Sequence, residues 1–416
     1  MVVVFVLVAA AVLAAFAALH YYAWRRLVRE TTAKGGWPRR IGTLVFVAGP
    51  VLVFAALGAE RGGAPFLLQQ VLAWPGFLWL AFALYLLLAL LVGEVVRPVL
   101  ARLMGARPAP RVDPIPVPEL TELPQLDPVV GVLDDTVGRP LAPTRRLVLA
   151  RTVGAAATLA AAGVVAGGAY GVLRGPTVKR VTVPLAKLPR AAHGFRIAVV
   201  SDVHLGPVLG RGFAENVVDT INATQPDLIA VVGDLVDGSV EDLAPAVAPL
   251  ARLSARHGTY FVTGNHEYFS GADPWVDHVR ELGLRPLENA RADIGAFDLA
   301  GVNDIAGENY GEGPDYAKAL GDRDTSRASV LMAHQPVMIH QAVQHGVDLQ
   351  LSGHTHGGQL WPGNFVAAAS NPTLAGLDRY GDTQLYVSRG AGAWGPPVRV
   401  GAPSDITVVQ LASKQA

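Results

Sequence analysis

The chain has 416 residues, more than one ordinary domain holds. Hydrophobic residues make up 51% of the chain and charged residues 16%, a balance too apolar for a wholly soluble protein. The chain has 34 basic and 34 acidic residues, so its formal net charge is zero. This balance does not suggest the overall positive charge that attracts nucleic acid. The absence of cysteine excludes thiolate metal ligands, cysteine nucleophiles and disulfides.

Four apolar stretches in the first 175 residues are long enough to cross a bilayer. They cover residues 2–19, 41–57, 71–92 and 152–173. Basic residues lie at their ends, which favours membrane spans over the alternative of buried helices in a soluble core. The fourth stretch is the weakest because Ala and Gly insert less favourably than Leu. We predict three spans within residues 1–104 and a fourth span, or an export-signal-like segment, over 147–175.

The segment before the fourth stretch carries an arginine pair. "TRRLVLA" (144–150) resembles a twin-arginine export signal, although such signals usually lie at the N-terminus. Arg145 and Arg146 are equally well explained as a cytoplasmic anchor. The Pro-rich residues over 105–146 are predicted to form an extended cytoplasmic linker with little core of its own.

The basic residues also predict an orientation. Arginines over 25–40 and 97–146 belong in cytoplasmic loops by the positive-inside rule. With four spans, the chain beyond Gly175 would face the extracytoplasmic side of the plasma membrane, and with three it would face the cytoplasm. We expect the former.

Residues 176–416 are predicted to form an α/β domain. Short β-rich runs cover 195–202, 227–234, 259–267, 329–336 and 348–356. Helical segments are expected at about 212–224, 242–256 and 273–283. Alternating apolar strands and helices indicate a sheet covered on both faces, with active groups at the carboxyl ends of the strands.

Polar side chains suited to metal binding follow each of these runs. They are Asp202, His204, Asp234, Asn265, His266, His334, His354 and His356. Carboxylate, amide and imidazole groups without thiolate suit Mn, Fe or Zn. They are too many for one tetrahedral ion and about enough for two. Asp234 is the natural bridge, because a carboxylate can join two ions whereas an imidazole usually serves one.

The motifs "SDVHLG", "VVGDLVDG", "VTGNHEY", "MAHQP" and "SGHTHGGQ" resemble those of the calcineurin-like metallophosphoesterases. "GHTHGGQ" and the tail "SRGAGAWGPPVRVGAPSDI" are similar to the membrane-associated, YkuE-type branch. The resemblance implies two packed mixed β-sheets flanked by helices.

The resemblance also implies a division of the ligands between two ions. One ion would take Asp202, His204 and His356. The other would take Asn265, His334 and His354, with Asp234 bridging both. His266 would stand near the substrate phosphate, stabilising it or protonating the leaving oxygen, and Glu267 would orient His266.

The expected function is that of a membrane-anchored hydrolase with two divalent metal ions. A metal-bridging hydroxide would attack a phosphate ester or pyrophosphate bond, in a phosphodiesterase or phosphatase reaction. The expected partners are the lipid bilayer and a phosphorylated, lipid-linked or envelope-related substrate, without nucleic acid. The alternative is a catalytically inactive membrane receptor or scaffold that uses the domain for binding.

Six further side chains near these motifs are weaker candidates: Asp237, Arg211, Arg389, Tyr268, Trp361 and Trp394. Asp237 is a candidate helix cap or hydrogen-bond partner of a ligand. The two arginines are candidates for contact with a substrate phosphate. The aromatic residues suit either an apolar rim or core packing.

Overall fold

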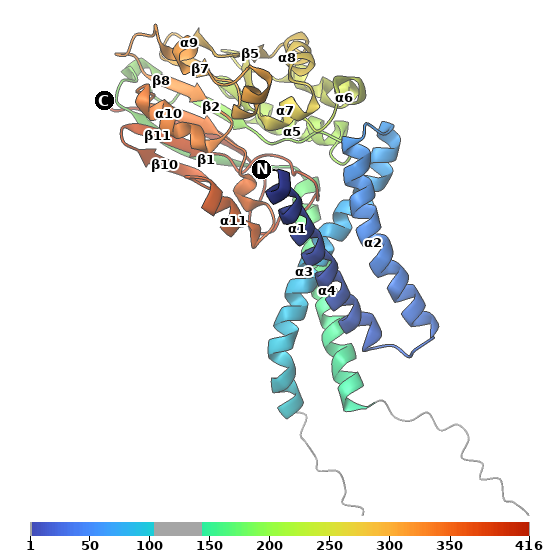
Figure 1. Cartoon of the computed structure of the whole chain (residues 1–416). Coiled ribbons are helices and arrows are strands. Elements are labelled where there is room, and N and C mark those ends of the chain that lie inside the picture. The colour runs from blue at the N-terminus through green and yellow to red at the C-terminus, as the bar shows by residue number, and fades with distance from the viewer. Residues whose placement is uncertain (1, 104–143, 416) are drawn as a thin grey trace, which may run out of the picture. The chain divides into compact units, whose positions relative to one another are not determined.

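The computed structural model describes residues 2–103 and 144–415 (Figure 1). The predicted linker over 105–146 therefore lies outside the described residues, except for its last three positions. The chain divides into two compact units. One contains Met1–Phe46 and Leu86–Ala161, and the other contains Val47–Tyr85 and Ala162–Ala416.

Four long helices form the N-terminal region. They are α1 (Val2–Trp24), α2 (Trp37–Arg61), α3 (Phe66–Leu103) and α4 (Arg145–Leu173). A π-helical turn, Arg25–Arg29, follows α1 directly. All four helices are long and apolar enough to cross a membrane. The predicted α-helical membrane region is thus confirmed, and the arginine pair lies in the first turn of α4.

Paired charges join α1 to α3 within the first unit. Arg26 lies 2.7 Å from a carboxylate oxygen of Glu94 and 2.8 Å from one of Glu30. The Tyr22 hydroxyl donates to Glu94 at 3.0 Å. These contacts compensate charge where each helix changes from apolar to basic sequence, as ionisable groups near a bilayer require.

The α/β domain contains two six-stranded mixed sheets. The first has, in spatial order, β1 (Thr177–Leu185), β12 (Asp405–Ser413), β2 (Arg196–Val200), β3 (Leu228–Val232), β4 (Thr259–Val262) and β5 (Arg285–Pro286). The second has β10 (Gly376–Tyr380), β11 (Thr383–Val387), β9 (Leu349–Ser352), β8 (Ser329–Met332), β7 (Asp298–Gly301) and β6 (Ala290–Asp293). The fold implied by the sequence motifs is therefore confirmed.

One apolar core lies between the sheets. Ile197 and Leu228 of the first sheet share it with Val330 and Leu349 of the second. These residues alternate along short strands, so each strand contributes one face to this layer. The five predicted strands are consequently divided between two sheets: β2, β3 and β4 in one, and β8 and β9 in the other.

Helices cover the outer face of each sheet. The domain helices are α5 (Arg211–Ala223), α6 (Val240–Val247), α7 (Asn265–Ser270), α8 (Ala272–Glu281), α9 (Tyr316–Leu320), α10 (Ile339–Gln344) and α11 (Gly363–Ser370). Short 3-10 turns cover Arg190–Ala192, Ala248–Arg252, Ile305–Tyr310, Pro336–Met338 and His356–Gly358. The predicted helix over 242–256 is α6 followed by such a turn, because Pro249 cannot donate an α-helical hydrogen bond.

Parts of two long helices belong to the same compact unit as the domain. Val208 packs against Ala56 of α2 and against Ala73 and Phe77 of α3. Phe66, the first residue of α3, packs on the core outside the first sheet. The hairpin of α2 and α3 is therefore a structural part of the unit that holds the predicted site.

Candidate metal centre

The loops after β2 and β3 are joined by backbone hydrogen bonds. The Asp202 amide donates to the Gly233 carbonyl at 3.1 Å, and the Val203 amide donates to the Asp234 carbonyl at 2.9 Å. Parallel pairing of β2 with β3 brings these two strand ends to the same level. Five of the predicted ligands have positive φ: Asp202, His204, Asp234, His354 and His356. Such backbone is uncommon outside glycine and gathers at functional sites.

The first group of predicted ligands comes from the ends of β2 and β9. Asp202, His204 and His356 each offer a donor atom, and these atoms lie within 4.8 Å of one another. The Nε2 atoms of His204 and His356 are 3.0 Å apart, and Asp202 Oδ1 lies 3.3 Å from His356 Nε2. All three side chains are buried. This group suits one ion.

The second group comes from β3, β8 and β9. Asp234, His334 and His354 also have donor atoms within 4.8 Å of one another. The Oδ1 atom of Asn265 lies 3.0 Å from His354 Nδ1, which brings the amide to this group. Asp234 Oδ2 is 3.1 Å from His334 Nε2 and 3.8 Å from His204 Nε2. Asp234 therefore lies between the groups, where a bridging carboxylate is expected.

The orientation of the imidazoles fits bound cations. His334 Nδ1 hydrogen-bonds to the Val232 carbonyl at 2.8 Å, which places a proton on Nδ1 and directs Nε2 toward Asp234. That Nε2 atom is buried and makes no well-aligned hydrogen bond among the described residues, although Asp234 Oδ2 lies 3.1 Å away. His204 is similar, because its Nδ1 pairs with Asp237 and leaves Nε2 facing a second imidazole nitrogen. His356 Nδ1 accepts from Arg399 Nη2 at 3.2 Å, so a neutral His356 carries its proton on Nε2, and a cation bound there would displace that proton.

The electrostatics agree with this donor set. Burial alone would raise the pKa of Asp234, but His334, His266 and His204 hold it well below its usual range. Burial and the charge of His334 lower the pKa of His354 to about 4. Burial would lower the pKa of His334, but Asp234 raises it well above its usual range, so an ion that binds here displaces the His334 proton, because metals bind carboxylates and neutral imidazoles.

His266 is held by Asp237. Its Nδ1 lies 2.6 Å from Asp237 Oδ1, and its ring packs edge-on against His204 with centroids 4.7 Å apart. Burial would lower the pKa of His266, but the hydrogen bond and charge of Asp237 raise it to about 9. Asp237 thus joins a predicted ligand, His204, to the predicted acid, His266.

The expectation that Glu267 orients His266 is wrong. The carboxylate of Glu267 accepts from the backbone amides of Asp234, Leu235 and Gly264 at 2.9, 2.7 and 2.6 Å. Glu267 is the third residue of α7, and its side chain turns back toward unpaired amides at that helix start, as acidic residues commonly do there. Burial and the nearby Asp234 raise its pKa. Glu267 therefore holds the loops that carry the ligands through their backbone amides, whereas Asp237 contacts the imidazole of His266.

Sequence reasoning missed Arg399. This buried guanidinium donates through Nη1 to the carbonyls of His356 and Ala402, both at 3.1 Å, and through Nε to the Gly392 carbonyl at 2.7 Å. Desolvation lowers its pKa to about 10. The only sequence signal for Arg399 was its position in the "PPVRVGAP" tail. That tail as a whole resembles the YkuE-type branch, and nothing in it singles out this arginine.

The weaker candidates are distributed around the centre. Arg211 pairs with Glu215 on the exposed side of α5. Tyr268 is buried and stacks on Tyr310. Trp394 is 51% exposed, and its ring centroid lies 5.7 Å from that of His266, so it contributes to an aromatic rim.

Comparison with known proteins agrees with this geometry. The model of the calcineurin-like phosphoesterase family matches residues 195–358. An "uncharacterized metallophosphoesterase" of Helicobacter pylori (strain J99) is 38% identical over 250 residues, which cover 59% of this chain and 67% of that protein. The zebrafish "transmembrane protein with metallophosphoesterase domain" is 38% identical over 255 residues, which cover 58% of each chain.

A third relative matches along most of its length. The Bacillus subtilis "uncharacterized metallophosphoesterase YkuE" is 31% identical over 272 residues, which cover 61% of this chain and 94% of that protein. The four apolar helices and the relatives named as transmembrane proteins indicate a membrane protein. The two-sheet fold, the grouped ligands and these matches together show that the chain belongs to the calcineurin-like metallophosphoesterase family.

Proposed function

We propose that the protein is a membrane-anchored phosphoesterase that uses two divalent metal ions. The observation that carries this proposal is the arrangement of seven donor side chains in two groups around Asp234. One group is Asp202, His204 and His356, and the other is Asn265, His334 and His354. The donor chemistry suits Mn, Fe or Zn.

The ions, when bound, would polarise the phosphoryl oxygens and supply a hydroxide nucleophile at neutral pH. Asp202 and Asp234 contribute only two negative charges, so the site keeps a net positive charge for an anionic phosphate. Asp237 holds Nδ1 of His266 at 2.6 Å and leaves Nε2 available to donate a proton to the leaving oxygen.

The membrane region suggests where the substrate is found. We propose that the protein lies in the plasma membrane with the domain on the extracytoplasmic side, because arginines gather in the loops that would be cytoplasmic. A phosphate ester or pyrophosphate carried by a lipid or by an envelope-related molecule suits a tethered enzyme. A reporter fused after Ala416 tests the orientation.

The alternative role, an inactive receptor or scaffold, is not favoured. A domain that only binds would not need the complete ligand set, yet each predicted ligand lies in one of the two groups. His266 also lies beside them.

The activity is tested with the purified full-length chain in detergent and added Mn²⁺. We expect hydrolysis of bis(p-nitrophenyl) phosphate or of the monoester, and the preferred compound identifies a diesterase or a monoesterase. Asp234→Asn and His354→Ala should remove the activity without unfolding the protein, whereas Arg211→Ala should retain it. A folded Asp234→Asn protein with the wild-type rate would contradict the proposal.

A further inference from the structure

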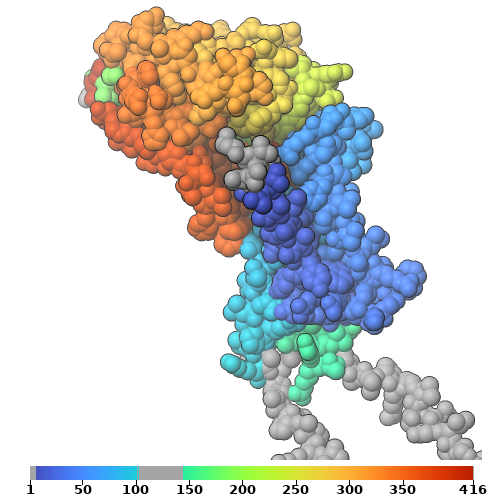
Figure 2. Space-filling model, viewed as in Figure 1, coloured from blue at the N-terminus to red at the C-terminus, as the bar shows by residue number. Residues whose placement is uncertain are grey.

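Helix α11 presents an uncovered apolar surface. None of its side chains is buried. Phe365 and Val366 are 65% and 72% exposed, and Trp361, just before the helix, is 48% exposed. No charged residue occurs from Leu360 to Leu377. Figure 2 shows this orange-red part of the chain projecting from the body of the domain. An uncharged apolar projection of this kind is typical of a surface that contacts a membrane, a ligand or another protein.

A hydrogen bond places the start of this segment against a predicted span. The Tyr85 hydroxyl of α3 donates to the Trp361 carbonyl at 3.0 Å. The apolar part of α3 extends between Gln70 and Glu94. Tyr85 lies fifteen residues after Gln70 and nine before Glu94, about 22 Å and about 14 Å along the helix at 1.5 Å per residue. The bond therefore falls within the apolar length of the helix.

This bond satisfies a backbone carbonyl beside an apolar helix, whose more N-terminal part packs on the domain through Val208. Inside a bilayer no water is present, so a backbone carbonyl needs a partner from the protein. The Tyr85 hydroxyl is such a partner, and the Trp361 amide donates to the Val400 carbonyl at 3.0 Å. Both polar backbone groups of Trp361 are thus satisfied, while its ring stays half exposed.

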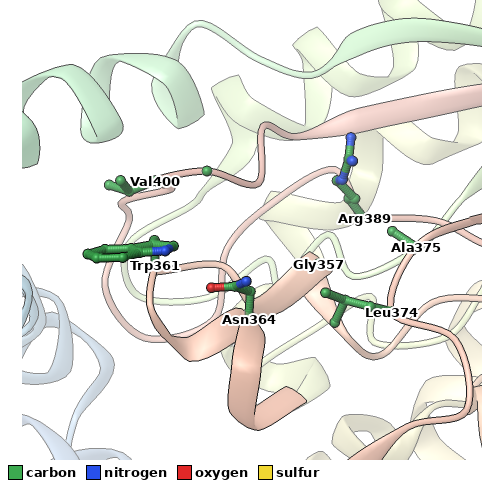
Figure 3. Close-up of a pocket in the computed structure, with 8 residues that line it drawn as sticks. Gly357, Trp361, Asn364, Leu374, Ala375, Arg389 and Val400 are labelled. Carbon is green, nitrogen blue, oxygen red and sulfur yellow. The ribbon is translucent and has the colours of Figure 1, made fainter. Parts of the chain in front are cut away.

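A cavity of about 230 Å³ lies beside the segment (Figure 3). Trp361, Leu374 and Val400 form apolar parts of its wall. Arg389 and Asn364 add polar groups, and the Asn364 Oδ1 atom is buried without a hydrogen-bond partner among the described residues. Gly357, which follows the predicted ligand His356, also lines it. The cavity thus combines an apolar wall with one cation and one amide, a combination that suits the headgroup region of an anionic amphiphile.

We propose that Trp361–Ser370 is a lipid-contacting element of the domain. Phe365 and Val366 insert among lipid acyl chains, and the adjoining cavity receives the anionic headgroup of a lipid. A bilayer is the occupant because the segment bonds to the apolar length of α3 and carries no charge. The insertion of Phe365 and Val366 into a bilayer is inferred from the exposure and contacts of this segment alone. The role of the lipid as substrate rests on the proposed phosphoesterase function.

The insertion is tested by site-specific fluorescence, because the native chain has no cysteine. Val366→Cys in the full-length chain is labelled with bimane and reconstituted in phosphatidylcholine–phosphatidylglycerol vesicles that contain acyl-brominated lipid. Ala317→Cys on α9, at the opposite end of the domain from α11 in Figure 1, is the matched control. We expect quenching of the label at 366 to exceed that at 317 by about threefold or more.

Equal quenching at both positions would overturn the insertion. Disulfide cross-links between two unlabelled Val366→Cys chains, together with no quenching of the labelled chain by lipid, would also overturn it and would identify a second copy as the occupant.

The substrate role is tested with one phosphate ester in two forms, dioleoyl in vesicles and dibutyryl in solution. In the double variant Phe365→Ser, Val366→Ser, the ratio of dioleoyl to dibutyryl hydrolysis should fall about tenfold, because the acyl chains lose their apolar contact. An unchanged ratio would overturn the substrate role. If the wild type hydrolyses bis(p-nitrophenyl) phosphate but neither form of the ester, the substrate role fails and the proposed function stands. The quenching result decides the insertion in either case.

Discussion

Asp237 is not a predicted ligand, but it orients two of the imidazoles in the centre. Its carboxylate contacts both His204 Nδ1, at 2.9 Å, and His266 Nδ1, at 2.6 Å. A hydrogen bond to the distal nitrogen fixes the tautomer and the ring direction of a metal-binding imidazole. One carboxylate thus orients a ligand and the proposed acid together.

Asp237→Asn should lower kcat about 10–100-fold, because an amide holds the two imidazoles less well than a carboxylate. The protein should stay folded, and KM should change less than kcat. Steady-state kinetics beside Asp219→Asn, an exposed aspartate on α5, checks this. A kcat within twofold of wild type would remove Asp237 from this role.

Gly353 shows how closely the ligand loops are packed. A methyl group at this position would overlap the Ser201 hydroxyl and the Asp202 carboxylate. Gly353→Ala should therefore lower the free energy of unfolding by about 1–3 kcal/mol and weaken metal binding. Chemical denaturation and metal analysis measure both effects. Gly212→Ala, where a methyl group meets nothing within 4 Å, should show neither, and equal behaviour of the two variants would contradict this view.

At the scale of elements, the hairpin of α2 and α3 supports the site as well as providing apolar spans. Val208 contacts Ala56, Ala73 and Phe77, and it lies in the loop that follows the predicted ligand His204. A single span would be enough for an anchor. The contact gives α2 and α3 a second role, which is to hold this loop.

Val208→Asp should separate the loop from the hairpin, since burying an unpaired polar group costs about 1–3 kcal/mol. We expect a lower melting temperature and weaker metal binding in the full-length protein. Val337→Asp, at an exposed valine of the domain, is the control. Unchanged metal affinity in folded Val208→Asp would show that the hairpin does not support the centre.

At the scale of the whole molecule, bound ions should stabilise the protein as well as activate it. Asp234 Oδ2 lies 3.1 Å from His334 Nε2 and 3.8 Å from His204 Nε2 in the core, so a bound cation would interact with all three groups at once. Ions present at about 100 times Kd would add about 2.7 kcal/mol to the free energy of unfolding.

A chelator should therefore lower the melting temperature and abolish hydrolysis together, and added Mn, Fe or Zn should restore both. Thermal unfolding and activity are followed in the same samples. The Asp234→Asn protein should show little change on chelation. A wild-type melting temperature that is insensitive to the chelator would argue against ions bound in this core.

The sequence by itself determined the elements and the chemistry of the ligands. Apolar runs of fixed length indicated the four long helices, because bilayer thickness sets that length. Short β-rich runs that end in Asp202, Asp234 and His354 indicated strand ends that deliver polar groups. Both signals are local, so neighbouring residues were enough to predict them.

Only the tertiary structure decided how distant segments meet. Glu267 binds backbone amides at a helix start and Asp237 pairs with His266, yet each is an acidic residue within three positions of a predicted site residue. Arg399 reaches His356 from more than forty residues away. The Tyr85 bond to Trp361 joins segments still further apart. Such contacts depend on packing between elements, which no local pattern encodes.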